Sequence, residues 1–120
     1  MRTAIFTFGG TATPGDLLML SYSAARGGRS TVKVVIGAPA GGDRNEKGWK
    51  MVTTIEEVVP AFVAEINGAS SEWSPGYGDF KASGKGDRLM VMCSTLMDDV
   101  KFSYDVEGAR TETCEIDVLG

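Results

Sequence analysis

The chain has 120 residues, of which 42% are hydrophobic and 23% are charged, and its formal net charge is −4. This length fits a single domain, residues 1–120, with a core that needs no help from metals or disulfides. The acidic balance disfavours direct nucleic-acid binding, and no apolar run approaches the roughly 18 residues of a membrane span. We therefore expect neither a nucleic acid nor a membrane as a partner.

The first part of the chain has the pattern of three strands separated by glycine-rich turns. Residues 2–8 form a short β-prone run. Residues 17–23, "LLMLSYS", and 31–37, "TVKVVIG", both alternate and flank a short connection containing glycine, which predicts a β-hairpin. Residues 38–50 are polar and glycine-rich, and are expected to form a long loop.

The stretch "TIEEVVPAFVAEING", residues 54–68, has the pattern of a helix. Its apolar residues recur every three or four positions, which gives one buried stripe. Thr54 and Glu57 match a capping box at its start. Pro60 lies too deep to be the first helical residue, so it either costs a hydrogen bond or moves the start of the helix towards itself. We expect one amphipathic helix over about 55–67.

The chain after this helix again has the pattern of strands. Residues 79–82 fit a short strand, and 88–94, "RLMVMCS", is apolar on both faces, which predicts a central strand covered on two sides. Residues 100–106 and 111–119 alternate with a period of two. Strands grouped on either side of one helix predict an α+β fold, with an antiparallel sheet or sandwich of about six to seven short strands and the helix packed on it.

Histidine is absent from the sequence. This excludes the Ser-His-Asp triad, the Cys-His pair and the commonest zinc ligands. Acid–base chemistry would fall to carboxylates, but neighbouring acids such as Glu56 and Glu57 or Asp98 and Asp99 usually point in different directions, and we interpret them as surface groups. The sequence therefore predicts a protein that is not an enzyme and has no cofactor or metal. A small enzyme using carboxylates is the least favoured alternative.

Two cysteines and three aromatic residues are the remaining candidates for a site. Cys93 and Cys114 fall on the predicted inward faces of strands, where buried thiols are the simplest interpretation. A disulfide between them would require Cβ atoms within about 4.5 Å. Trp49, Trp73 and Tyr77 fall on predicted loops, where aromatic side chains either pack over neighbouring elements or contact a partner or a sugar ring.

Charge is distributed unevenly along the chain. Residues 1–50 carry seven Lys or Arg against three Asp or Glu, a net charge of +4. Residues 51–120 carry five against thirteen, a net charge of −8. The simpler interpretation is an unevenly sampled solvated surface. The sharper one is that basic and acidic sides meet in head-to-tail copies of the protein.

Several segments together resemble a module of phage virion proteins, found chiefly in tails. The matching segments are "GTATPGD" (10–16) followed by "LLMLSYS" (17–23), "TTIEEVVPAFVAEIN" (53–67), "GDRLMVMCS" (86–94) and "VEGARTETCEIDV" (106–118). The family pattern is a G-T-x-x-x-G-D opening, an alternating strand, a threonine-capped helix and further strands. The resemblance implies a structural role without an active site, in a subunit present in many copies.

We therefore expect a structural subunit of a bacteriophage particle, localised in the virion. Its place would be the tail or baseplate, or the capsid surface as a decoration protein. Its expected partners are copies of itself and other virion proteins. The alternative is a β-rich module that binds carbohydrate or a host surface through Trp49, Trp73 and Tyr77.

Overall fold

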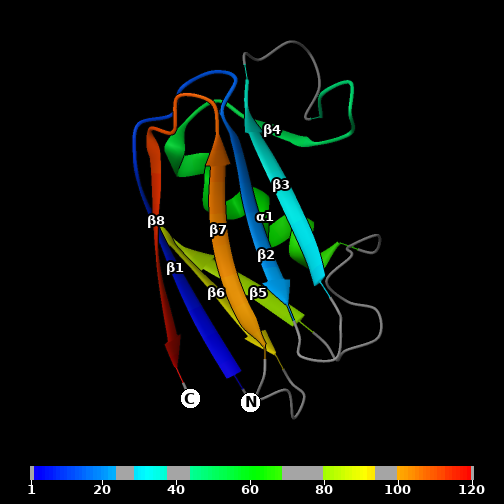
Figure 1. The fold of residues 1–120 in the computed structure, drawn as a ribbon, viewed down its shortest axis with the longest axis vertical. Coiled ribbons are helices and arrows are strands. Elements are labelled where there is room, and N and C mark those ends of the chain that lie inside the picture. Colours follow the sequence, from blue (N-terminus) through cyan, green and yellow to red (C-terminus); the bar gives the residue numbers. More distant parts are fainter. Residues whose placement is uncertain (1, 24–28, 38–43, 69–79, 94–99, 120) are drawn as a thin grey trace.

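The computed structural model describes residues 2–23, 29–37, 44–68, 80–93 and 100–119. Within these ranges the chain forms eight strands and one α-helix preceded by a 3-10 turn (Figure 1). The elements in chain order are β1 Arg2–Gly10, β2 Leu17–Ser23, β3 Arg29–Ile36, β4 Lys50–Val52, η1 Ile55–Glu57, α1 Val58–Asn67, β5 Phe80–Lys85, β6 Arg88–Cys93, β7 Lys101–Glu107 and β8 Glu112–Leu119. No helix in this described part is long and apolar enough to cross a membrane.

The strands form two four-stranded sheets. Sheet A has the order β5-β6-β1-β8 and is antiparallel throughout. Sheet B has the order β4-β3-β2-β7 and is antiparallel except for the parallel pair β3–β4. The expected α+β class and the β2–β3 hairpin are confirmed. The strand that the sequence did not predict is β4, which has only three residues and lies in the segment expected to be a loop.

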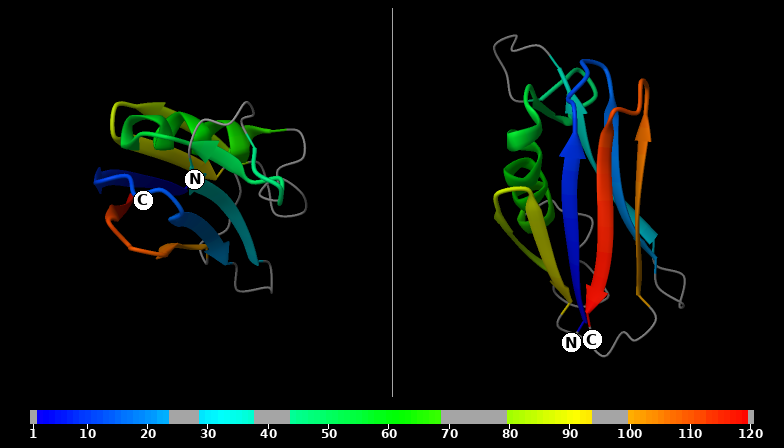
Figure 2. Two further views of the ribbon diagram at one scale, coloured as in Figure 1. Left: turned by 90° about the horizontal axis from the view of Figure 1, so that it is seen from above. Right: turned by 90° about the vertical axis from the view of Figure 1, so that its left-hand side faces the viewer.

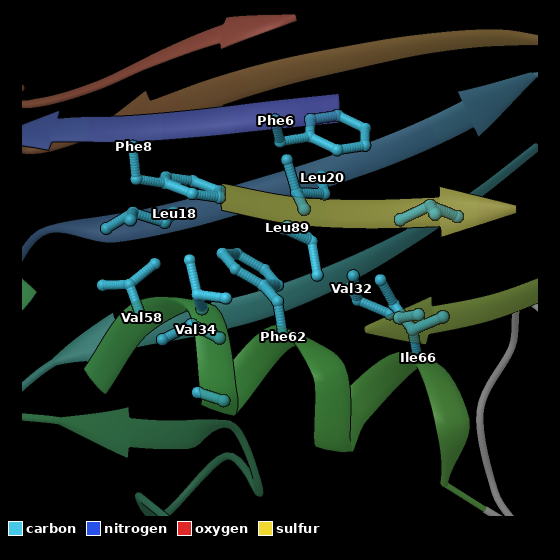
Figure 3. Close-up of a cluster of buried hydrophobic side chains, with 14 of the residues drawn as sticks. Phe6, Phe8, Leu18, Leu20, Val32, Val34, Val58, Phe62, Ile66 and Leu89 are labelled. Atoms are coloured by element: carbon cyan, nitrogen blue, oxygen red, sulfur yellow. The ribbon is translucent and has the colours of Figure 1, made fainter. Parts of the chain in front are cut away.

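The core lies between the inner faces of the two sheets (Figure 3). Alternate residues of β1 and β2, such as Phe6 and Leu20, are completely buried because a strand points every second side chain the same way. The ring of Phe8 stacks on that of Phe62 from α1, with centroids 5.6 Å apart. Aromatic pairs from both sheets and the helix therefore meet in one cluster.

The helix α1 lies between the sheets on one long side of the sandwich. It contacts β5 and β6 of sheet A and β3 and β4 of sheet B, and Figure 2 shows it filling the space between them. Its buried residues are Val58, Val59, Ala61, Phe62 and Ile66. The predicted apolar stripe is thus confirmed, and the helix covers the gap between two sheets rather than the middle of one.

The start of the helix shows how the chain accommodates Pro60. Residues Ile55–Glu57 form a 3-10 turn, and α1 begins at Val58, which makes Pro60 its third residue. The first four N–H groups of a helix have no acceptor within it, so the missing N–H of proline costs no hydrogen bond here. Glu57 accepts hydrogen bonds from the N–H and hydroxyl groups of Thr53 and Thr54, which lower its pKa.

The strand β6 corrects one prediction. It does lie inside its sheet, between β5 and β1, but its outward face is not covered as expected. Met90 is 38% exposed, and Met92 is half-buried. An apolar residue on the outer side of a sheet strand therefore did not indicate a second layer, and Met90 remains on the surface.

Candidate functional site

The two long sides of the sandwich differ in how their strand edges end. On one side, α1 lies against the edge strands β5 and β4, and we call this the covered side. On the other side, β7 and β8 are the last strands of their sheets and lie next to each other, as Figures 1 and 2 show. We call this the open side. An edge strand presents backbone groups to whatever approaches it, so the open side is the candidate site.

The backbone of β8 shows which groups this edge offers. The N–H of Phe8 donates to Asp87 O on the β6 side, and the N–H of Thr11 donates to Thr111 O on the β8 side. Hydrogen bonding alternates along an antiparallel strand. The backbone N–H and C=O groups of odd-numbered β8 residues therefore bond to β1, and the backbone groups of even-numbered residues point away from β1, out of the edge of the sheet. The outward-pointing backbone groups are those of Cys114, Ile116 and Val118, together with Glu112.

The edge of β5 on the covered side is closed by a side chain. The Asn67 amide donates to Ala82 O at 2.7 Å and accepts from Ala82 N at 2.9 Å. These are the two hydrogen bonds that an added strand would make with Ala82. A Cβ on Gly84 would collide with Val59, so the helix also packs tightly on this strand. The β5 edge is therefore already occupied at Ala82.

A bidentate ion pair ties the segment before β4 to the same helix. The guanidinium of Arg44 donates to both carboxylate oxygens of Glu65, each at 2.8 Å. Arg44 also donates to Gly48 O. The covered side thus combines apolar burial of α1 with polar contacts at the edges of both sheets.

The surface of the open side is acidic and ends in apolar residues. Asp105, Glu115 and Asp117 are exposed on β7 and β8. Val118 is 44% exposed and Leu119 is 47% exposed. Val118 lies on the same face of β8 as Cys114 and Ile116, which pair with the buried Phe8 and Phe6. It occupies the last inward position of an edge strand, where only β1 lies beside it, so it remains accessible.

One end of the open side is held by a buried carboxylate that the sequence analysis did not single out. Asp16 is 2% exposed and lies at the start of β2. It accepts hydrogen bonds from the backbone N–H groups of Ala109 at 2.7 Å, Arg110 at 3.0 Å and Thr111 at 3.4 Å. The connection from β1 to β2 is therefore attached to the turn from β7 to β8.

A second carboxyl group, that of Glu112, lies beside Asp16. Glu112 is 2% exposed, and its Oε2 accepts from Thr13 N at 2.8 Å. Among the described residues, Oε1 of Glu112 has no hydrogen-bond partner, so an ionised Glu112 would bury an unpaired charge. Burial and the hydrogen bond with Asp16 raise the pKa of Glu112. Burial opposes ionisation of Asp16, but its hydrogen bonds from Glu112 and the backbone lower its pKa.

The turn from β7 to β8 fits closely around this pair. Gly108 has φ of +113°, and a Cβ there would collide with the Asp16 carboxylate. The hydroxyl of Tyr104 donates to Glu112 O at 3.0 Å, and burial raises the pKa of Tyr104. The two carboxyl groups thus act as a structural junction between the crossovers of the two sheets. No local pattern indicates the pairing of Asp16 with Glu112, because the two residues lie far apart in the chain.

The structure places the two cysteines at separate positions. Both thiols are free, with Cys93 buried and Cys114 half-buried. Cys93 pairs with Arg2 at one end of β1, and Cys114 pairs with Phe8 near the other end. Six residues of strand separate these positions, or about 20 Å, which is too far for a disulfide within one chain. Burial raises the pKa of Cys114 to about 12, so it is a poor nucleophile.

Of the predicted loop aromatics, only Trp49 lies within the described residues. It is half-buried, and the ammonium groups of Lys33 and Lys47 lie 4.7 Å and 4.9 Å from its ring centroid. A sugar stacking on this ring would compete with these cation–π contacts. Trp73 and Tyr77 lie outside the described residues, as does the predicted acidic pair Asp98 and Asp99.

No group of three or more potential metal ligands occurs among the residues that the structure describes. Comparison of the chain with family models, with curated proteins and with solved structures found no match.

Proposed function

We propose that the protein is a structural subunit of a bacteriophage particle and assembles with copies of itself and other virion proteins through its open side. The observation that carries the proposal is the β8 edge, with outward backbone groups at Cys114, Ile116 and Val118 and exposed apolar side chains at Val118 and Leu119. A strand of this kind can pair with a strand of another chain.

The assignment to a phage particle, in the tail or baseplate or on the capsid surface, comes from the sequence resemblance. The opening motif "GTATPGD" supports it, because its last residue, Asp16, holds the turn between β7 and β8. Thr11 of the same motif donates its N–H to Thr111 O in that turn at 3.0 Å. The motif therefore has a structural task at one end of the open side, which suits a module without an active site.

The experiment is to block the β8 edge without disturbing its pairing with β1. Val118→Pro removes an outward N–H and leaves the inward hydrogen bonds of β8 in place. Val118→Thr is the matched control, because it keeps both the N–H and the β-branched shape. Mass is measured by light scattering over a range of concentrations.

We expect the wild-type protein and Val118→Thr to form the same oligomers, and Val118→Pro to shift to monomer at concentrations well below the millimolar range. Oligomers of unchanged size in Val118→Pro, with unfolding curves like those of the wild type, would contradict assembly through this edge.

A further inference from the structure

A second surface of the molecule combines exposed apolar and charged groups. It is the outer face of sheet A, formed by the side chains that point away from the core. Within the described residues, α1 packs against the inner side of this sheet, and Figure 2 (right) shows the four strands side by side from the outside. Met90 on this face is 38% exposed and Leu119 is 47% exposed.

The strand register shows that charge on this face is divided by sign. Lys85 pairs with Arg88, which pairs with Thr7, which pairs with Glu115, so these four residues form one row across the sheet. The basic residues stand on β5 and β6, and Glu115 stands on β8. All three charged side chains are exposed.

The next row of the same face supplies the apolar part. Met90 pairs with Ile5, and Ile5 pairs with Asp117 on β8. Met90 and Ile5 thus lie in the middle of the face, between a basic margin on one side and an acidic margin on the other. Interfaces between proteins commonly combine a central apolar patch with a polar rim.

We propose that the outer face of sheet A binds the same face of a second copy, related by a two-fold axis that runs along the strands. A rotation of 180° about this axis exchanges the β5 side and the β8 side of the face. The basic margin of each copy therefore meets the acidic margin of the other. The row of Lys85 and Arg88 then lies opposite Glu115 of the partner copy. Ile5 and Met90 of the two copies meet in the centre.

The charge pattern also excludes the other simple arrangement. A two-fold axis across the strands would place each β5 opposite β5 of the other copy and each β8 opposite β8, so the basic margin would face a basic margin and the acidic margin an acidic one. Such like-charge contacts are unfavourable. The arrangement along the strands keeps the strands of the two sheets nearly aligned, which is a common way for sheets to pack.

The small area of the face limits the strength of this contact. Four strands spaced ~4.8 Å apart and three rows of about 6.8 Å give roughly 400 Å² per copy. A stable dimer buries about 800 Å² per partner, so the contact is weak in isolation. The inference therefore rests on the proposed function in one respect, because a weak contact becomes effective when many copies are held together.

The experiment reverses the charge of one margin at a time in the Val118→Pro background, where the β8 edge is blocked. The two products are called the exchanged variants. One variant carries Lys85→Glu and Arg88→Glu, so both margins of its face carry acidic groups and Lys81 on β5 stays basic. The other carries Glu115→Lys and Asp117→Lys, so its face is basic throughout. Asp105→Lys with Glu107→Lys, on β7, is the control with the same change in net charge as the second variant. Sedimentation velocity up to about 1 mM protein reports dimer formation.

We expect the parent and the β7 control to dimerise at the upper end of this range. Each exchanged variant alone should bind itself at least about tenfold more weakly, and a one-to-one mixture of the two should dimerise at least as strongly as the parent. Such rescue also shows that both variants are folded.

Dimers that persist in both exchanged variants, or a mixture that remains monomeric, would overturn the inference. A parent that is monomeric at every concentration would also overturn it. These results are distinct from failure of the proposed function, which is tested by the effect of Val118→Pro on the otherwise unchanged protein.

Discussion

The covered side and the open side of the sandwich differ in what lies against their edge strands. Both contain the edge strands of two sheets, and such edges invite pairing with another chain. On the covered side, α1 fills the gap, and Asn67 makes the hydrogen bonds of a missing strand with Ala82. On the open side, β8 keeps its outward backbone groups and exposes Val118. The comparison suggests that stability is concentrated on one side and assembly on the other.

Removing the main apolar contact of the covered side should have the largest effect. Phe62 is completely buried and stacks on Phe8. Phe62→Ala leaves a cavity and should lower the free energy of unfolding by about 3–5 kcal/mol, measured by denaturant titration. Val118→Ala on the open side should change it by less than about 1 kcal/mol. Similar losses from the two substitutions would contradict the division between the sides.

The junction at the end of the open side should come next. In Asp16→Asn, one carboxylate oxygen becomes an NH2 group that faces the backbone N–H donors of the β7–β8 turn. The loss of charged hydrogen bonds should lower the free energy of unfolding by about 2–3 kcal/mol, measured by denaturant titration. Asp117→Asn, at an exposed acid on β8 away from the turn, serves as a control and should have little effect. An unchanged stability in Asp16→Asn would show that the junction does not hold the turn.

Opening the covered edge should make the two sides more alike. Asn67→Ala removes both hydrogen bonds to Ala82 and should cost about 1–2 kcal/mol of stability. It should also allow the β5 edge to pair with other chains, so that oligomers form even when Val118→Pro blocks β8. Light scattering of the double variant is the measurement. A double variant that remains monomeric would show that the helix alone protects this edge.

The carboxyl pair gives a smaller effect that depends on pH. The pKa of Glu112 is raised in the folded protein. As pH rises above the ordinary carboxyl pKa, Glu112 therefore loses its proton in the unfolded chain while it still keeps it in the folded protein. Glu112 therefore contributes a stability that falls as pH rises towards its folded pKa. Asp16 has a lowered pKa and contributes a stability that is lost as pH falls through its folded pKa.

Glu112→Gln separates these two contributions, because its amide can still donate to Asp16 but cannot ionise. Unfolding is measured from pH 4 to pH 8 in both proteins. We expect the variant to gain stability relative to the wild type as pH rises, while the loss at low pH due to Asp16 remains. Parallel pH profiles would mean that Glu112 does not retain its proton on folding.

Salt should have the smallest effect. If opposite charges on neighbouring copies help assembly, raising the salt concentration from about 50 to about 500 mM should weaken self-association through screening. Sedimentation equilibrium at both concentrations is the measurement. Association that does not depend on salt would point to a purely apolar interface.

Much of the fold could be predicted from local patterns. Residue patterns identified seven of the eight described strands, four of them by alternation (17–23, 31–37, 100–106 and 111–119), and the apolar stripe identified the helix that contains Phe62. The strand β4 was not predicted because three residues are too few to show a period. Met90 was assigned to a covered face because its residue type, taken alone, does not distinguish an outer sheet face from a core.

The site was much harder to predict. Asp16 stood out only as the end of a turn, and nothing in its neighbourhood indicated that the turn after β7 would surround it. The role of Asn67 was hidden for the same reason, since its partner Ala82 lies on a strand that follows a long connection. Contacts between distant segments depend on tertiary packing, which a single sequence does not display.

The most direct test of the open side is amide hydrogen exchange along β8 at low and high protein concentration. We expect the outward N–H groups of Cys114, Ile116 and Val118 to become protected from exchange as protein concentration rises. The inward N–H groups of Glu115 and Asp117 already bond to β1, and Ala82 on the covered side is already held by Asn67, so their protection should change little. Outward N–H groups that exchange equally fast at both concentrations would contradict assembly through the β8 edge.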